Sequence, residues 1–432
     1  MHTKKHLGFN ALRSTLSERF NQLEDKRQNG KVKHTLHDCL MSGFAMMFFQ
    51  DSSILQFQRR LEDASHHNNL RNIFQVQSIP KDTQMRDVID SIDSKDIEPL
   101  FEDFFRVLQR GKHLESYRVM DDYYLISIDG SGYFSSDKIS CPCCLWKESK
   151  GGKLRYEHQI VQAAMMRPGK RQVIPLAPEA VKNIDGTQKQ DCEIEAGKRL
   201  IKKIRRAHPK LKIIIVADSL YSKQPFIESL KTEGMSYILV AKPEDHKMLM
   251  EWVGEQKKLG EVSKIQIKDN KGRLHVYEWI NKVPLNGRED AVSVNYFEYR
   301  LFNANGKEGF HNSWVTDIPV SGQNVEELVR GGRSRWKIEN EVFNTLKNQG
   351  YEIEHNYGHG DKSLSMNFFL LNLLAFFFHQ IFELTDNLYQ RCRMKFSSKR
   401  NMWECLREVI RILLFPDWET LLKRVISPME FL

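Results

Sequence analysis

The chain has 432 residues, of which 41% are hydrophobic and 28% are charged, so two or three domains with a sizeable core are expected. Its 65 Lys and Arg residues exceed its 56 Asp and Glu residues, and the formal charge of +9 suits a polyanionic partner. The seven cysteines do not resemble a secreted disulfide framework, and the N-terminus lacks an apolar signal core. The longest apolar stretch, residues 366–378, is interrupted by two asparagines and is short for a membrane span. We therefore expect a reduced, cytoplasmic protein without a membrane partner.

The first 118 residues are predicted to be helical and to form a domain of their own. Residues 36–49 are apolar, and Asp82, after a proline, is expected to cap a helix that runs to residue 92. Residues 99–108 form an amphipathic pattern that begins with a proline, which suits the first turn of a helix.

Two short apolar runs rich in β-branched residues predict buried strands. Residues 124–129 end at Asp129, and residues 211–218 end at Asp218, each followed by small or turn-forming residues. Further strands are expected at 158–166, 172–176 and 237–241, and a helix at 222–233. Strands that alternate with helices in this way indicate an α/β sheet.

Three cysteines are crowded between the first two strands. Cys141 and Cys144 have the spacing of a zinc half-site, which Cys143, His158 or Cys192 would complete. The sequence has no second pair with that spacing. We therefore favour unligated thiols, with a structural zinc as the alternative.

A basic segment precedes the second aspartate. Residues 197–215 contain no acidic residue, and the part before Pro209 has the apolar spacing of an amphipathic helix. Its outer face is predicted to contact DNA phosphates through Lys202, Lys203, Arg205 and Arg206. The alternative is an ordinary solvated face.

The 121 positions between Asp218 and Glu339 exceed what one helix and a loop require. Residues 264–268, 274–279 and 295–302 alternate in polarity around Asn and Gly turns, which predicts β-hairpins. Two tryptophans in this β-rich insertion, Trp279 and Trp314, are expected to be core aromatics or to stack on DNA bases.

Residues 333–347 are predicted to be a helix, because Trp336, Phe343 and Leu346 recur at helical spacing. Arg335 lies four residues before Glu339 and shares its face. Glu341 lies about 200° around an α-helix from Glu339 and is expected to face solvent.

Asp129, Asp218 and Glu339 occur in the order strand, strand, helix, which is that of a two-metal phosphoryl-transfer site. Mg²⁺ prefers oxygen ligands, so these carboxylates are predicted to be catalytic and to hold two Mg²⁺ or Mn²⁺ ions. Nearby cations are predicted to contact DNA phosphates: Arg333, Arg335 and Lys347. For His355 and His359, phosphate or backbone contacts are favoured over metal binding.

The combination of motifs resembles the DDE-type transposases of bacterial insertion sequences, over roughly residues 31–382. The matching segments are Ser127–Ser131, Val216–Ser219, the Arg-x-Arg-Trp-x-Ile-Glu helix, Cys141–Cys144, the Asp191-Cys-Glu run and Glu354–Gly360. One branch of that class has a Tyr-x2-Arg-x3-Glu-x6-Lys pattern. Here Gly332 stands at the Tyr position, and Lys347 lies one residue late.

The resemblance implies an RNase H-like α/β catalytic core with a β-rich insertion and an N-terminal helical domain that binds DNA ends or contributes to assembly. Metal-dependent cleavage at the element's ends, strand transfer into target DNA and a homodimer on double-stranded DNA are implied too. The alternatives are an inactive DNA-binding relative and an RNase H-like nuclease without strand transfer. The predicted divisions are 1–118 (helical domain), 119–255 (core), 256–322 (insertion), 323–385 (core) and 386–432 (helical tail).

Overall fold

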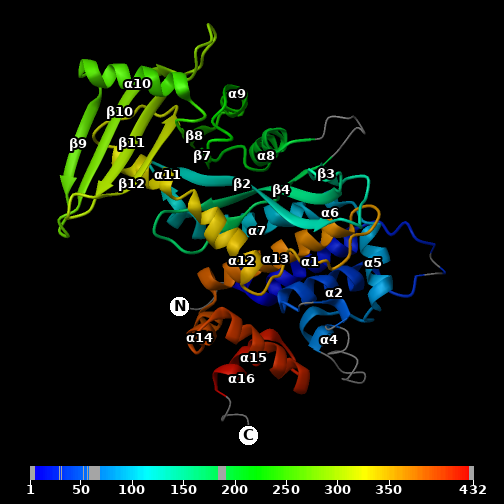
Figure 1. Ribbon diagram of the computed structural model, residues 1–432. Coiled ribbons are helices and arrows are strands. Elements are labelled where there is room, and N and C mark those ends of the chain that lie inside the picture. The colour runs from blue at the N-terminus through cyan, green and yellow to red at the C-terminus, as the bar shows by residue number, and fades with distance from the viewer. Residues whose placement is uncertain are drawn as a thin grey trace.

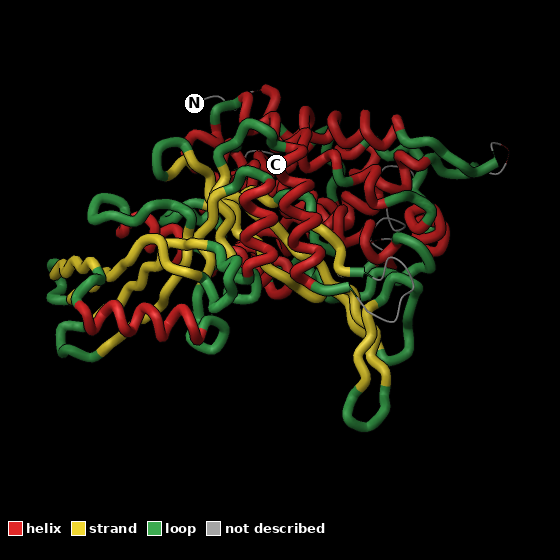
Figure 2. The backbone as a smooth tube through the Cα atoms, turned by 90° about the horizontal axis from the view of Figure 1, so that it is seen from above, coloured by secondary structure: helices red, strands yellow, loops and turns green. Residues whose placement is uncertain are grey.

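The computed structural model describes residues 5–28, 30, 32–51, 53–55, 57, 69–182 and 191–427. These residues form a mixed α/β structure, in which one large sheet runs out of a body of helices (Figure 1). The end of the sheet that lies farthest from the helical body is formed by the strands within residues 263–316 (Figures 1 and 2).

The described residues contribute twelve strands to this sheet. They are β1 (Arg118–Val119), β2 (Tyr123–Ser136), β3 (Leu145–Glu148), β4 (Leu154–Met166), β5 (Ile174–Pro175), β6 (Glu179–Val181), β7 (Ile213–Ala217), β8 (Ser236–Val240), β9 (Ser263–Lys268), β10 (Leu274–Pro284), β11 (Ser293–Phe302) and β12 (Glu308–Thr316). Their order is β3-β4-β2-β7-β8-β12-β11-β10-β9, with β1 on β2 and with β5 and β6 on β4.

The centre of the sheet is parallel and its two sides are antiparallel. β2 pairs with β7 and β7 with β8 in parallel, which suits β7, since all five of its residues are buried. The hairpins predicted between the second aspartate and the glutamate are present as β9–β10, β10–β11 and β11–β12. They extend the same sheet, because β12 pairs with β8.

Helices cover both faces of the sheet and make up the rest of the body (Figure 1). Before the sheet come η1 (Lys5–Leu7), α1 (Phe9–Gln22), α2 (Leu36–Phe48), α4 (Asn69–Phe74), α5 (Asp82–Asp90), α6 (Ser94–Ile97), α7 (Pro99–Arg110) and η3 (His113–Tyr117). Within and after it come α8 (Glu193–Ala207), α9 (Gln224–Thr232), α10 (Lys247–Leu259), α11 (Val325–Arg333), η4 (Ile338–Phe343), α12 (Asn344–Asn348), α13 (Leu364–Thr385), α14 (Asn387–Met394), α15 (Lys399–Ile412) and α16 (Trp418–Ile426).

The ends of two predicted helices can be compared directly with the structure. Pro99 occupies the first turn of α7, as expected. The predicted cap at Asp82 is one residue late: Lys81 is the N-cap, and Asp82 is the first helical residue of α5.

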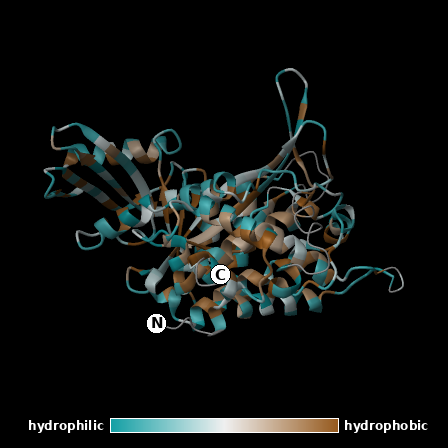
Figure 3. Ribbon diagram, turned by 90° about the horizontal axis from the view of Figure 1, so that it is seen from below, coloured by the Kyte–Doolittle hydropathy of each residue, from teal (hydrophilic) through white to brown (hydrophobic). Residues whose placement is uncertain are grey.

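Helix α13 is the centre of the helical body. It is 22 residues long and, by length and composition alone, could cross a membrane, because the helix extends beyond the apolar stretch at 366–378 on both sides. However, 83% of its most apolar window is buried inside the structure, against helices such as α2, α5 and α7. Hydrophobic residues are accordingly concentrated in the helical body and the strands (Figure 3).

The two ends of the chain share this core. Phe9 of α1 stacks on Trp418 of α16, with ring centroids 5.4 Å apart. The side chain of Asn69 donates to the carbonyl oxygens of Ile410 and Leu413, each at 2.8 Å, and accepts from the N–H of Phe415 at 2.8 Å. The N-terminal helices thus pack against the C-terminal ones, and the divisions at residues 118 and 385 stay predictions.

We predict that Asn69→Ala lowers the free energy of unfolding by about 2–3 kcal/mol, because it removes three hydrogen bonds and leaves the buried N–H of Phe415 without this partner. Asn72→Ala is the matched control, since this exposed residue makes one bond, to the carbonyl of Phe415; it should cost less than about 1 kcal/mol. Equilibrium denaturation in urea measures both. Equal losses would contradict the role assigned to Asn69.

Candidate active site

Two aspartates lie side by side on the central parallel strands. The register pairs Ser127 of β2 with Val216 of β7, so two residues further along Asp129 comes beside Asp218, on strands about 4.8 Å apart. Asp218 directly follows the last residue of β7, as the sequence predicts. The prediction that the other strand ends at Asp129 was wrong: β2 continues to Ser136, because these later residues still pair with β4.

A glutamate reaches the same place from a helical segment. Glu339 lies in η4, a wide helical turn of the π type that follows α11 and is held by the buried side chains of Ile338 and Val342. Such wide turns are often found at functional sites. Arg335 Nη1 is 2.6 Å from Glu339 Oε1 and 3.6 Å from Asp129 Oδ2. Arg335 and Glu339 therefore lie on one face, as expected from their spacing, and the same guanidinium links the helical segment to β2.

A fourth carboxylate, Glu193 at the start of α8, joins the group. Its Oε1 accepts a hydrogen bond from the hydroxyl of Tyr221 at 2.9 Å. Its Oε2 lies against the backbone of Gly130, where an added Cβ would come within 2.2 Å, so a side chain at position 130 would displace the Glu193 carboxylate. The sequence marked the Asp191-Cys-Glu run without giving Glu193 a role. An acid in the first turn of a helix commonly stabilises the helix dipole. The sequence therefore could not distinguish that role of Glu193 from membership of the acidic site.

The electrostatics of the group centre on Asp129. Burial raises the pKa of Asp129 to about 7, Arg335 opposes the rise, and the charges of Asp218, Glu193 and Glu339 add to it. Burial also raises the pKa of Glu193; the hydrogen bond from Tyr221 opposes that rise and Asp218 adds to it.

The donor set fits divalent cations. Among the residues that the structure describes, Arg335 is the one cation in ion-pair contact with these four acids. Four converging carboxylates with one counter-charge form an oxygen-rich, electronegative site of the kind that Mg²⁺ or Mn²⁺ occupies.

Three other predicted residues around Glu339 do not contact the acids in the structure. Arg333 stacks over the Phe310 ring at 4.5 Å. Lys347 forms an ion pair with Glu354 at 2.8 Å. Glu341 is partly buried and lies 3.8 Å from Arg171, so the expectation that it faces solvent was wrong; the π-type turn does not follow α-helical spacing.

The three tryptophans singled out in the sequence differ from the prediction in one case. Trp314 is buried and stacks on Phe297 at 5.3 Å, and Trp279 is buried as well, so both are core aromatics. Trp336 was predicted to share the buried face but is 62% exposed. Gly332 has no room for the Tyr of the related pattern, because an added Cβ would lie 2.6 Å from Trp314 Nε1.

Two of the four basic residues on the outer face of α8 are bound within the protein, and two are exposed. Lys203 pairs with Glu98 at 3.0 Å and Glu179 at 2.8 Å. Arg205 donates to the carbonyls of Glu233 and Gly234, which fastens the end of α8 to the turn after α9. Lys202 and Arg206 are exposed. The structure therefore leaves two of the four predicted phosphate contacts on the surface.

Comparisons with known proteins identify related families. A model described as DDE_Tnp_1-associated matches residues 17–105, and a model described as Transposase DDE domain matches residues 146–377, just over half of the chain. The second match includes Asp218 and Glu339 and begins beyond Asp129. No curated protein matches the chain.

Two solved structures are similar over most of the chain. One is a piggyBac transposase synaptic complex with hairpin DNA, with 11% identity, coverage of 94% of this chain and 84% of that one, and a TM-score of 0.33. The other is a Drosophila P element transposase strand transfer complex, with 10% identity, coverage of 98% and 87%, and a TM-score of 0.22. Both TM-scores are below 0.5, so neither alignment establishes a shared fold.

We predict that Asp129→Asn stabilises the protein in metal-free buffer and that the gain grows with pH. The folded protein holds this carboxyl at a pKa of about 7, against an ordinary value of 3.8. A raised folded pKa means that the wild-type stability is full below about pH 4 and is lost as the pH rises through 7. The shift limits the gain to at most about 4 kcal/mol.

Denaturation midpoints in the presence of EDTA, near pH 4 and near pH 8, measure this gain. Glu341→Gln is the control, because its carboxylate pairs with Arg171 outside the group. A gain from Asp129→Asn that is the same at both pH values would contradict the raised pKa of Asp129.

Proposed function

Because the chain belongs to the transposase DDE domain family, we propose that it cuts DNA at the ends of an insertion sequence and joins the freed ends to target DNA. Asp129, Asp218 and Glu339 are the proposed catalytic acids. The observation that carries the proposal is that acids from two strands and a helix meet, so that Asp218 and Glu339 raise the pKa of Asp129, beyond the effect of burial.

We place the RNase H-like core in the part of the sheet that carries the aspartates. Its support is the parallel centre β2-β7-β8, flanked by antiparallel β4 and covered by α8, α9 and α11. Strands β9 to β12 are the proposed β-rich insertion, since they come between β8 and the glutamate segment in the chain and extend the sheet outward from β8. The divisions at residues 118, 255, 322 and 385 belong to this proposal.

The four carboxylates would hold two Mg²⁺ or Mn²⁺ ions. Bound there, such ions supply Lewis-acid stabilisation of the charge that develops on the attacking and leaving oxygens. Asp129 can act as a ligand only when ionised, and Arg335 supports that form. With Tyr221 on its Oε1, Glu193 has its other oxygen beside Gly130 and Asp129.

Arg335 has two roles in the proposal. Its 2.6 Å bond to Glu339 fixes the orientation of that carboxylate toward Asp129. Its guanidinium also has donors for a DNA phosphate next to the reacting bond, which a planar fork of N–H groups suits. Trp336, exposed on the next residue, offers an apolar surface beside it.

The exposed Lys202 and Arg206 on α8 are the proposed phosphate contacts at a distance from the acids. In this proposal Lys347 contacts DNA only after its ion pair with Glu354 breaks. Arg333 likewise has to break its contact with the Phe310 ring. Assembly as a homodimer on double-stranded DNA in the cytoplasm completes the proposal and follows from the resemblance of the motifs.

We predict that Asp129→Ala, Asp218→Ala and Glu339→Ala each abolish cleavage while DNA affinity stays within about tenfold, because these acids act mainly on the transition state. Glu193→Gln should slow cleavage by at least about tenfold. The assay is single-turnover cleavage, with Mg²⁺ or Mn²⁺, of DNA that carries the inverted repeats flanking the gene. Glu341→Ala is the control and should cut normally.

The products separate the alternatives. Joined products with a target plasmid support transposition, whereas cleavage without joining indicates a nuclease, and binding without cleavage by the wild type indicates an inactive DNA-binding relative. If Glu339→Ala cut DNA and Glu341→Ala did not, the assignment of the third acid would be wrong.

A second prediction concerns the basic helix. Lys202→Ala and Arg206→Ala should each weaken binding to any DNA sequence, and each should reduce the log–log salt slope by roughly 0.9, the value for one neutralised phosphate. Lys203→Ala is the matched control, because its ammonium group already pairs with Glu98 and Glu179. If the slope changed as much in Lys203→Ala as in Lys202→Ala, the inference that Lys202 is available to DNA and Lys203 is not would be refuted.

A further inference from the structure

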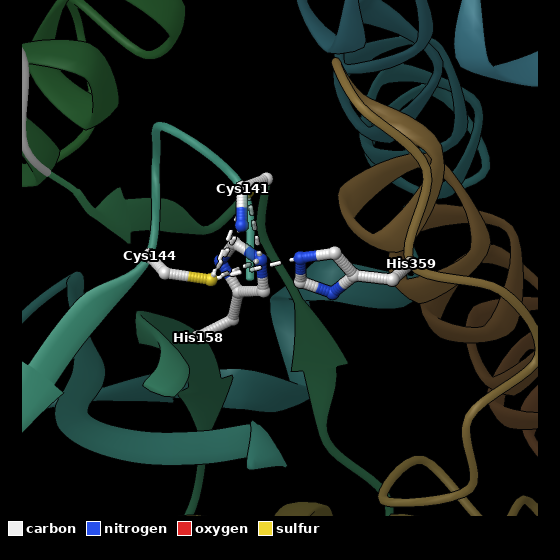
Figure 4. A group of neighbouring side chains, drawn as sticks. All are labelled: Cys141, Cys144, His158 and His359. Carbon is white, nitrogen blue, oxygen red and sulfur yellow. Dashed lines mark hydrogen bonds between the residues drawn. The ribbon is translucent and has the colours of Figure 1, made fainter. Parts of the chain in front are cut away.

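A second group of metal-binding side chains lies away from the acids. Cys141 and Cys144 come from the loop before β3, His158 from β4, and His359 from the loop before α13. One donor atom from each lies within 4.8 Å of all the others. Figure 4 shows that the four side chains converge from three separate segments.

The local chain explains how the two cysteines come together. The N–H of Cys144 donates to the carbonyl of Cys141 at 3.1 Å, which closes a tight turn. The N–H of Cys141 in turn donates to Cys144 Sγ at 3.4 Å. Such hydrogen bonds to sulfur are common in the outer shell of metal-bound thiolates.

Four of the distances between donor atoms match those of a tetrahedron around zinc. With Zn–S and Zn–N bonds of about 2.3 and 2.05 Å, tetrahedral angles put two sulfurs about 3.8 Å apart, and sulfur and nitrogen about 3.6 Å apart. The two Sγ atoms are 3.8 Å apart. His158 Nε2 is 3.5 Å from each of them, and His359 Nε2 is 3.6 Å from Cys144 Sγ. A disulfide does not account for this arrangement, because its S–S bond is about 2.05 Å long.

We propose that Cys141, Cys144, His158 and His359 bind one structural zinc ion. Two thiolates and two imidazoles in tetrahedral geometry select zinc over oxygen-preferring cations such as Mg²⁺. All four positions are filled by protein, so no site is open for a substrate. Of the predicted completing ligands, His158 takes part, whereas Cys192 is exposed and Cys143 lies outside the four.

The surroundings suit a closed site with an entry path. Three of the four ligands are buried, and the ring of Phe134 packs on His359 at 4.4 Å and on His158 at 5.6 Å. Cys141 and His158 also line a cleft of about 570 Å³, through which an ion can enter.

The ion would fasten the sheet to the helical body. His158 pairs with Phe134 in the same β2–β4 ladder that pairs Gln162 with Asp129. His359 precedes α13, the central helix of the body. Zinc at this point would therefore hold the far part of β2 against the loop before α13. This inference does not rest on the proposed function.

The test is the metal content of the untagged full-length protein, purified without chelator and measured by mass spectrometry. One zinc per chain is expected, and Cys144→Ser and His359→Ala should each lose it. Cys143→Ser and Cys192→Ser are matched controls that should keep it. Circular dichroism checks that each variant is folded.

Two further measurements keep the ligand set testable if a variant fails to fold. Cobalt-substituted wild type should show the visible absorption of tetrahedral thiolate coordination. A zinc chelator should lower the melting temperature of the wild type, and zinc but not Mg²⁺ should restore it. Folded wild type without zinc, or loss of zinc in Cys143→Ser but not in Cys144→Ser, would overturn the proposal.

Discussion

The parallel register of β2 and β7 brings Asp129 and Asp218 to adjacent positions, and the rest of the site is arranged around the charge that results. Like charges in a partly buried place favour protonation, which burial alone already favours, so the pKa of Asp129 rises to about 7. One guanidinium, that of Arg335, opposes this rise. A pKa raised in this way lowers the stability of the fold once the carboxyl ionises, as is common where function and stability compete.

Close packing of α11 against the sheet puts the third acid in place. Gly331 and Gly332 let the helix approach Ile238 and Trp314 so closely that an added Cβ would lie 3.1 and 2.6 Å from their side chains. After residues 334–337 comes the wide turn η4, which packs on β2 and carries Glu339. The glycine that replaces the Tyr of the related pattern is thus required by the packing of Trp314.

The net charge of +9 overstates the cationic surface that is free for DNA. Lys203 and Lys347 form ion pairs with acids. Arg205 donates hydrogen bonds to backbone carbonyls, and Arg333 stacks over an aromatic ring. Surface ion pairs of this kind add little stability and are broken readily. Binding of a polyanion can therefore involve an exchange of partners at Lys347, whereas Lys202 and Arg206 need no such exchange.

Local patterns in the sequence predicted most elements, and together with the family resemblance they singled out three acids whose catalytic role stays a prediction. Period-two alternation with Asn and Gly turns predicted the hairpins, and apolar runs predicted β7 and β8, because these signals depend on near neighbours. The continuation of β2 past Asp129 was missed, since pairing with β4 rather than local sequence sustains that strand. The exposure of Trp336 was missed because a π-type turn follows it and breaks the 3.6-residue period.

The composition of both proposed metal-binding groups was decided by tertiary structure. Glu193 reaches Asp129 because α8 starts beside Gly130, and no spacing in the sequence signals that contact. His359 is 215 residues from Cys144 in the sequence, and the two side chains come together because the loop before α13 packs beside β4. Residue types and short spacings are properties of the chain, whereas ligand sets depend on which strands and helices pack together, and that is settled only when the whole core forms.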